Sequence, residues 1–112
     1  ANFTPERFLE NMAQCDVFVG LKRKTLVGTV SLGGDKLHAL FVEPSWQGQG
    51  IGRCLVDHLE AHAAARGIRL LRVSSSITAC AFFEKLGYHL LAFEPHRDGS
   101  TFLMSKRLGR SP

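Results

Sequence analysis

The stretch VEPSWQGQGIGRCLVDHLEAHAAARGI, residues 42–68, contains the features that decide the fold. It follows a short apolar segment, passes through Gly48, Gly50 and Gly52, and continues as an amphipathic helical pattern. Glycine costs backbone entropy, so a cluster of glycines where a helix begins needs a physical reason. The first N–H groups of a helix have no intrahelical partner, and together with the helix dipole they bind anions. The stretch therefore predicts a diphosphate site at the start of a helix, to which Arg53 would add positive charge.

Two familiar glycine-rich nucleotide motifs fit this loop poorly. A P-loop requires Gly-Lys-Ser/Thr after its glycines, and no such sequence follows here. A dinucleotide-binding fold has its glycines directly after the first strand, whereas residues 44–46 (Pro-Ser-Trp) intervene in this chain. The pattern favours a phosphate-bearing cofactor bound by another fold.

The bulk composition limits the classes of protein that the chain can belong to. Its 112 residues, 45% of them hydrophobic, predict a single domain over residues 1–112. The absence of an apolar run of about 18 residues predicts no membrane span. The net charge of +4 is spread along the chain without a basic stripe interleaved with aromatics, so we expect no nucleic-acid partner. Three cysteines without paired spacing favour a reducing, cytoplasmic location.

Hydrophobic periodicity predicts nine elements in the order α-β-β-β-α-β-α-β-β. Helices are expected over residues 4–13, 50–66 and 78–86, and strands over residues 16–22, 26–32, 37–42, 68–76, 88–93 and 101–108. The first helix is predicted because Thr4 can cap it and Pro5 suits its first position. The strand, helix and strand over residues 37–74 predict a right-handed parallel crossover. The expected fold is therefore α+β, a mixed, mostly antiparallel sheet with helices on both faces.

Two segments resemble the motifs of the GCN5-related N-acetyltransferases, the GNAT family. Residues 37–68 resemble that family's motif A, in which a Gln/Arg-x-x-Gly-x-Gly/Ala loop follows a Leu-x-Val-x-Pro strand. Residues 79–88, ACAFFEKLGY, resemble its Ala-x-x-Phe-Tyr-x-x-Leu-Gly-Phe helix. The resemblance runs from about residue 15 to residue 108. Family members usually begin with a further strand and helix, so the resemblance implies an N-terminally shortened member, a piece of a longer chain, or a chain that a partner subunit completes.

The resemblance implies acetyl-CoA as cofactor and transfer of its acetyl group to a primary amine of a small molecule or peptide. The pantetheine arm of the cofactor would lie in a splay between the two central parallel strands. The residues implied in cofactor binding belong to the strand end, the glycine loop and the later helix. They are Leu40, Phe41, Val42, Gln47, Gly48, Gln49, Gly50, Ile51, Gly52, Arg53, Ser76 and Phe83.

The transfer needs a neutral amine, although a lysine-like amine has a pKa of about 10.4 and is mostly protonated near neutral pH. Glu43, His38 and Asp35 are the candidate bases, and each also has a plain structural interpretation: Glu43 and His38 as solvent-facing or packed strand residues, and Asp35 as a turn residue. The resemblance implies that a backbone N–H of residues 40–42 binds the developing oxyanion. His58 and His62 lie four residues apart, but no third ligand accompanies them, so no metal site is expected.

The departing thiolate raises a separate question, because the family often protonates it with a tyrosine that is Phe83 here. Cys80, Ser76 or water are the candidate substitutes, although the sequence favours Cys80 as a small buried helix residue over a catalytic one. The missing tyrosine also supports an alternative function, in which the chain is a non-catalytic acyl-CoA-binding or sensing module. Because the missing opening elements would leave apolar surface or a sheet edge uncovered, we expect a homodimer.

Overall fold

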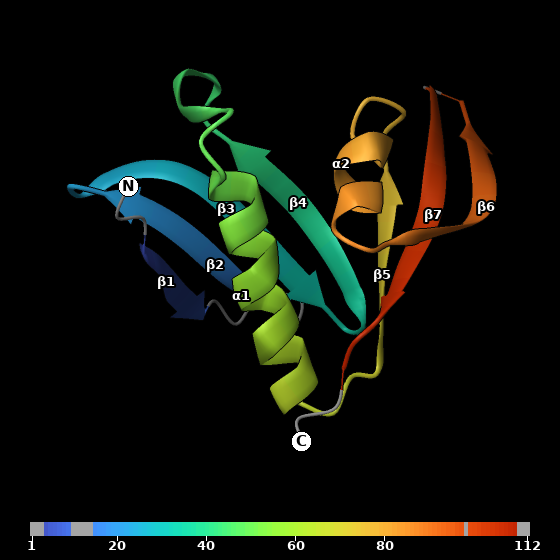
Figure 1. The fold of residues 1–112 in the computed structure, drawn as a ribbon, viewed down its shortest axis with the longest axis horizontal. Helices are drawn as coiled ribbons and strands as arrows, with labels where there is room; N and C mark the ends of the chain where they lie inside the picture. Colours follow the sequence, from blue (N-terminus) through green and yellow to red (C-terminus); the bar gives the residue numbers. More distant parts are fainter. Residues whose placement is uncertain (1–3, 10–14, 98, 110–112) are drawn as a thin grey trace.

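The computed structural model describes residues 4–9, 15–97 and 99–109, which form one seven-stranded sheet with two α-helices (Figure 1). The strand order is β1-β2-β3-β4-β5-β7-β6. The elements are β1 Thr4–Leu9, β2 Cys15–Lys22, β3 Thr25–Gly33, β4 Lys36–Val42, the 3-10 helix η1 Pro44–Trp46, α1 Ile51–Ala65, β5 Leu70–Ser75, α2 Cys80–Lys85, β6 His89–His96 and β7 Gly99–Arg107. Every neighbouring pair is antiparallel except β4 and β5. The predicted mixed, mostly antiparallel α+β fold with a central parallel crossover is confirmed.

The first described segment is a strand, so the predicted helix over residues 4–13 is wrong. β1 pairs with β2 in an unbroken antiparallel register, from Thr4 opposite Leu21 to Leu9 opposite Asp16. A short helix is only marginally stable by itself, whereas pairing along β2 gives this segment a ladder of hydrogen bonds. Pro5 is tolerated because β1 is at the edge of the sheet. Residues 10–13 of the predicted helix lie outside the described residues.

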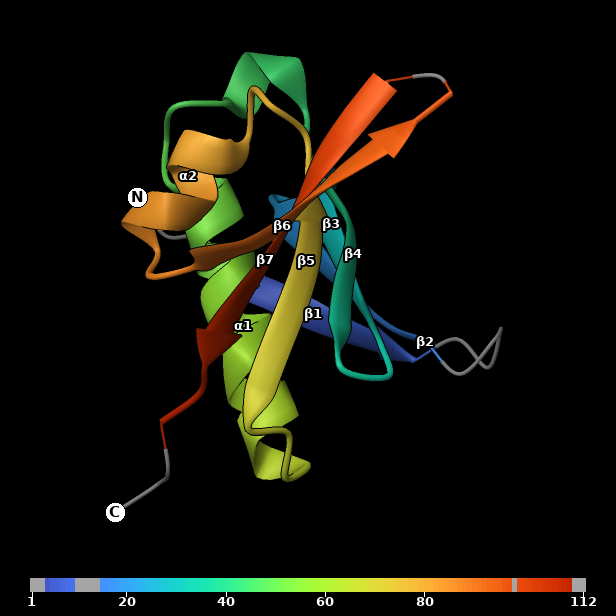
Figure 2. The ribbon, with the colours of Figure 1, turned by 90° about the vertical axis from the view of Figure 1, so that its right-hand side faces the viewer.

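Both described helices lie over the same face of the sheet, whereas the sequence predicted helices on both faces (Figures 1 and 2). The chain crosses from β4 through α1 to β5, and then from β5 through α2 to β6, in the same direction along the sheet. Right-handed crossovers that advance in one direction place their helices on one side. As a result, the two helices can border a common site.

The core lies between α1 and the middle of the sheet. The predicted apolar face of α1 is confirmed, because Ile51, Leu55, Val56, Leu59 and Ala63 are all at most 4% exposed. Burying each of the larger side chains contributes roughly 1.5–3 kcal/mol. α1 comes so close to β3 at Gly28 that a Cβ there would lie 2.9 Å from Leu55 Cδ1. The helix is thus fixed tightly over β3 with its first turn near the end of β4.

The other predicted elements are also present. The hairpin of β2 and β3 turns at Arg23 and Lys24, both of which have positive φ. Gly67 and Gly87, with φ of +87° and +97°, follow α1 and α2 as the expected helix stops. Asp98 of the predicted β6–β7 turn lies outside the described residues. Neither α1 nor α2 is long and apolar enough to cross a lipid bilayer.

Candidate active site

β4 and β5 separate soon after they begin, which opens the centre of the sheet. They pair only at Lys36 with Arg72 and at Leu37 with Val73. In β4, Ala39 adopts a φ of +52°, and the register with β3 shifts at this point. A bulge of this kind bends a strand, and Figure 1 shows β4 turning away from β5 beyond it. The splay that the resemblance implied is therefore present.

The glycine loop carries the chain from β4 into α1. Gly48 and Gly50 both have a φ of +81°, and a Cβ on either would meet nothing within 4 Å. Gly50 is the N-cap, and no side chain caps the helix. The first helical hydrogen bond runs from the Cys54 N–H to the Gly50 carbonyl at 3.0 Å, so the preceding N–H groups have no intrahelical partner. Gln47 Nε2 donates to the Val42 carbonyl at 3.2 Å, which ties the loop to β4.

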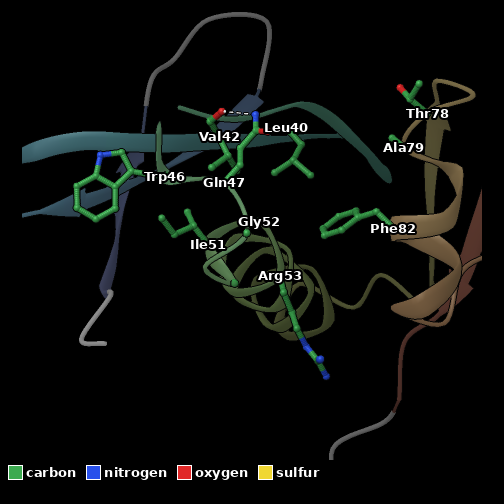
Figure 3. Close-up of a pocket in the computed structure, with 12 residues that line it drawn as sticks. Leu40, Val42, Trp46, Gln47, Ile51, Gly52, Arg53, Thr78, Ala79 and Phe82 are labelled. Atoms are coloured by element: carbon green, nitrogen blue, oxygen red, sulfur yellow. Dashed lines mark hydrogen bonds between the residues drawn. The ribbon is translucent and has the colours of Figure 1, made fainter. Parts of the chain in front are cut away.

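A cavity of about 500 Å³ lies against this loop (Figure 3). Eight of the predicted cofactor residues line it: Leu40, Val42, Gln47, Gly48, Gly50, Ile51, Gly52 and Arg53. Phe41 does not, because successive strand residues point to opposite faces and Val42 already faces the cavity. Phe41 is 52% exposed. Gln49 is exposed and is also absent from the lining.

Part of the wall of this cavity comes from residues of α2 and of the turn before it that were not among the predicted cofactor residues. Thr78, Ala79 and Phe82 line it, together with Trp46 of η1. Figure 3 shows the Phe82 ring pointing from α2 toward Gly52. A Cβ on Gly52 would lie 3.3 Å from Phe82 Cζ, so this glycine also leaves room for the ring. The spacing of Ala79 and Phe82, one helical turn apart, is the sequence signal that these two share a face.

A second cavity of about 310 Å³ lies beside the first, at the splay between β4 and β5. The two cavities share Leu40 and Ala79. Besides Leu40, three predicted site residues border the second cavity: His38, Ser76 and Phe83. A molecule that reaches through the junction at Leu40 and Ala79 would contact both spaces.

Of the candidate catalytic residues His38, Glu43 and Cys80, only His38 borders one of the two cavities. His38 borders the second cavity, whereas Glu43 lines neither cavity. Cys80 also lines neither, and its Sγ lies 3.9 Å from Met104 Sδ of β7. The Ser76 hydroxyl accepts a hydrogen bond from the Ala79 N–H at 3.2 Å, so it stabilises the turn into α2.

Tyr88, the only tyrosine of the chain, lies next to Phe83 but its hydroxyl is bound elsewhere. The two rings meet edge to face with centroids 5.4 Å apart. The Tyr88 hydroxyl donates to Glu60 of α1 at 2.8 Å, and Lys106 Nζ lies 2.9 Å from the same carboxylate. Burial, with the Glu60 hydrogen bond and charge, raises the pKa of Tyr88 well above its ordinary value. This tyrosine therefore joins α1 to the C-terminal strands and is a poor substitute for the family's acid.

His62 is bound in a second cluster that joins α1 to β2. Its Nε2 lies 2.5 Å from Asp16 Oδ2, and Arg66 donates to the same oxygen at 2.7 Å. Burial alone would raise the pKa of Asp16, but the hydrogen bonds and charges of His62 and Arg66 outweigh it and lower the pKa. The Phe18 ring packs edge to face against the His62 ring, with the ring centroids 5.1 Å apart. The cluster is structural and lies at the end of α1 opposite the glycine loop.

Comparison with known proteins agrees with this geometry. The sequence matches the model of the acetyltransferase (GNAT) domain over residues 2–108, and the chain belongs to this family. Over 62 residues it is 37% identical to the peptidyl-lysine N-acetyltransferase YjaB of Salmonella typhimurium strain LT2, a match that covers 55% of this chain and 41% of that protein. The chain spans about half the length of the curated relatives that it matches.

Solved structures show the same fold. A GCN5-related N-acetyltransferase from Rhodopseudomonas palustris superposes with a TM-score of 0.81 and 31% identity, over 84% of this chain and 62% of that one. A GNAT family acetyltransferase from Elizabethkingia anophelis, solved with acetyl-CoA bound, superposes with a TM-score of 0.85 over 96% of this chain and 99% of that one. At 11% identity, this second likeness concerns the fold alone.

Proposed function

We propose that the chain is an acetyl-CoA-dependent N-acetyltransferase that acts on a primary amine. The observation that carries the proposal is the adjacency of two cavities that share Leu40 and Ala79, one against an uncapped helix start and one at the splay of the sheet. Family membership and the acetyl-CoA bound to the Elizabethkingia anophelis structure support the same cofactor.

The residues of the first cavity fit the cofactor. The side-chain-free surface of Gly48 and Gly50 and the unpartnered N–H groups of residues 51–53 suit a diphosphate. Beyond Leu37, β4 has no partner on its β5 side, so its backbone groups are available to the amides of a pantetheine arm. When bound, acetyl-CoA supplies an acetyl thioester whose carbonyl carbon the amine attacks.

The chain's own residues would serve this reaction in the second cavity. A backbone N–H of residues 40–42 would donate to the oxyanion, a contribution on the order of 10²–10³ in rate. His38 borders the space in which we place the amine, and it is a better candidate than Glu43 or Cys80 because those two line neither cavity. No tyrosine is needed for departure of the sulfur, because a thiol of pKa about 8.5 is a tolerable leaving group.

Thiol release from acetyl-CoA tests the proposal. The assay uses a panel of amines that contains a lysine peptide, a polyamine, an amino acid and an aminoglycoside, with each amine omitted in turn as control. We expect amine-dependent release of free thiol, first of all with the lysine peptide, because a relative is named as a peptidyl-lysine N-acetyltransferase. Tight acetyl-CoA binding without thiol release from any amine would instead support the non-catalytic acyl-CoA-binding function.

The location of the protein is a further part of the proposal. In the described residues Cys54 and Cys80 are free thiols. Free thiols are typical of a reducing compartment, which supports a cytoplasmic location.

A further inference from the structure

Glu94 lies on the edge strand β6, yet its carboxylate reaches back across β7 toward β5. Its Oε1 accepts hydrogen bonds from the Ser74 hydroxyl of β5 at 3.2 Å and from the Thr101 hydroxyl of β7 at 3.3 Å. β7 separates the other two strands, and Thr101 is the β7 residue that pairs with Glu94. Ordering a long glutamate side chain costs rotamer entropy, so two converging hydroxyl donors are needed to hold it there.

The carboxylate fixes the direction of these hydrogen bonds. An ionised carboxylate has no proton to give, so Ser74 donates its only proton and keeps its oxygen lone pairs for another group. Thr101 likewise donates to Glu94, and it therefore accepts the 2.9 Å hydrogen bond from His96 Nε2. Ser74 borders the second cavity. A residue of the cavity wall thus carries a hydroxyl that can only accept further hydrogen bonds, with the Glu94 carboxylate behind it, an arrangement suited to an ammonium group.

We propose that Ser74 and Glu94 remove the proton from the acceptor amine, an inference that rests on the acetyl transfer proposed above. Ser74 is the catalytic residue because its Oγ would contact the amine, and Glu94 is a positioning residue that acts through Ser74. The ammonium gives a proton to Ser74 Oγ while the Ser74 hydroxyl proton passes to Glu94, which later returns it to solvent. The amine nitrogen then bonds to the acetyl carbon and the carbon–sulfur bond breaks. The nitrogen loses its second proton to water, and the departing thiolate takes one from water.

Other charged groups near this cavity are less suited to the task. Lys36 borders it, but an ammonium does not accept a proton. Arg72 beside Ser74 is paired with Asp35 at 2.9 Å. His38 stands on the β4 wall and is the competing base, so it needs its own variant.

The pH dependence of kcat/KM for the amine separates a proton-removing role from a structural one. The probe is Nα-acetyl-lysine amide, whose amine has a pKa of about 10.4, or otherwise the most basic amine of the panel that reacts. With a base in place, the rate of the wild type should vary little between about pH 7 and pH 9, since a protonated amine can still be used. Glu94→Gln keeps an oxygen that accepts from Ser74 but removes the base. Its rate should be about 10²-fold lower near pH 7 and rise roughly tenfold per pH unit, following the neutral amine.

Ser74→Ala should show the same steep pH dependence of kcat/KM as Glu94→Gln. In both variants the rate should fall with little change in acetyl-CoA affinity. The matched control is Glu84→Gln, the same substitution on the exposed side of α2, which should leave the profile unaltered. A kcat/KM of Glu94→Gln that does not vary with pH, or a steep pH dependence only in His38→Gln, would overturn this inference. Neither result would contradict the proposed acetyl transfer. Absence of thiol release from the wild type with every amine would overturn both proposals together.

Discussion

Two adjacent phenylalanines of α2, Phe82 and Phe83, border different cavities of the candidate site. Phe82 lines the cavity at the glycine loop, whereas Phe83 is 3% exposed and borders the second cavity. The motif match predicted that this helix faces the site, because Ala79 and Phe82 are one turn apart. The motif match did not predict the hydrogen bond between Ser74 and Glu94, because these residues come into contact only through the pairing of β7 between β5 and β6. Local spacing predicts which residues share a helix face, but a contact across three strands depends on the sheet order.

Phe83→Tyr is the residue-scale prediction. We expect kcat to rise, by up to about tenfold, because a phenol at this position could protonate the departing thiolate, and general acids contribute about 10²–10⁴ where they are needed most. The affinity for acetyl-CoA should change little. The measurement is kcat with one amine at saturating cofactor. If Phe83→Tyr and Phe83→Ala both leave kcat unaltered, residue 83 is remote from the sulfur and its assignment to the thioester pocket fails.

At the scale of elements, α1 was predictable and β1 was not. The helix carries its own signals: the glycine entrance, the apolar face from Ile51 to Ala63 and the stop at Gly67. The segment over residues 4–9 carries helix-start signals as well, and only pairing with β2 makes it a strand. The bulge at Ala39 was also missed, because a non-glycine residue with positive φ leaves no mark in a single sequence. The local signals of α1 agree with its place in the fold, whereas those of residues 4–9 are overruled by the pairing with β2.

The cluster of Asp16, His62 and Arg66 that joins β2 to α1 predicts a pH-dependent contribution to stability. Since the folded protein lowers the pKa of Asp16 below its usual 3.8, ionised Asp16 stabilises the fold. This contribution is complete above that value and is lost as the pH falls through the lowered pKa. Near pH 7, Asp16→Asn should therefore reduce the free energy of unfolding by roughly 1–3 kcal/mol, as expected for hydrogen bonds to a charged group.

Urea unfolding of wild type and Asp16→Asn between about pH 7 and pH 2.5 measures the effect. The difference between the two proteins should shrink below the usual pKa of Asp16, while Asp57→Asn, an exposed carboxylate of α1, should show little difference at any pH. A difference that stays constant down to the lowest pH would contradict the assigned cause.

At the scale of the whole molecule, three of the seven large apolar side chains that are exposed among the described residues lie on β6, at one edge of the sheet. Leu90, Leu91 and Phe93 of the edge strand β6 are 54–56% exposed. The sequence predicted the fold class and the central crossover, but it did not predict that β6 is an edge. That position follows from β7 pairing between β5 and β6, and antiparallel hairpins are compatible with either order.

We propose that the chain forms a homodimer through this edge, because exposed edge strands with apolar side chains are ready to pair with another chain. Sedimentation velocity at tens of micromolar should show a dimer. Leu91→Lys should shift it to monomer, because a lysine on an edge strand opposes pairing. A wild type that remains monomeric at these concentrations would contradict the proposal.

We propose that the glycine loop at the start of α1 binds the diphosphate of acetyl-CoA, and calorimetric titration of acetyl-CoA measures this binding. Gly50→Asp places a carboxylate at the proposed anion site, whereas Gly67→Asp makes the same substitution at a glycine of similar φ and equal openness at the other end of the helix. We expect Gly50→Asp to weaken acetyl-CoA binding at least about tenfold, which is about 1.4 kcal/mol, and Gly67→Asp to bind acetyl-CoA like the wild type. Equal affinity of Gly50→Asp and wild type, with both folded by circular dichroism, would contradict it.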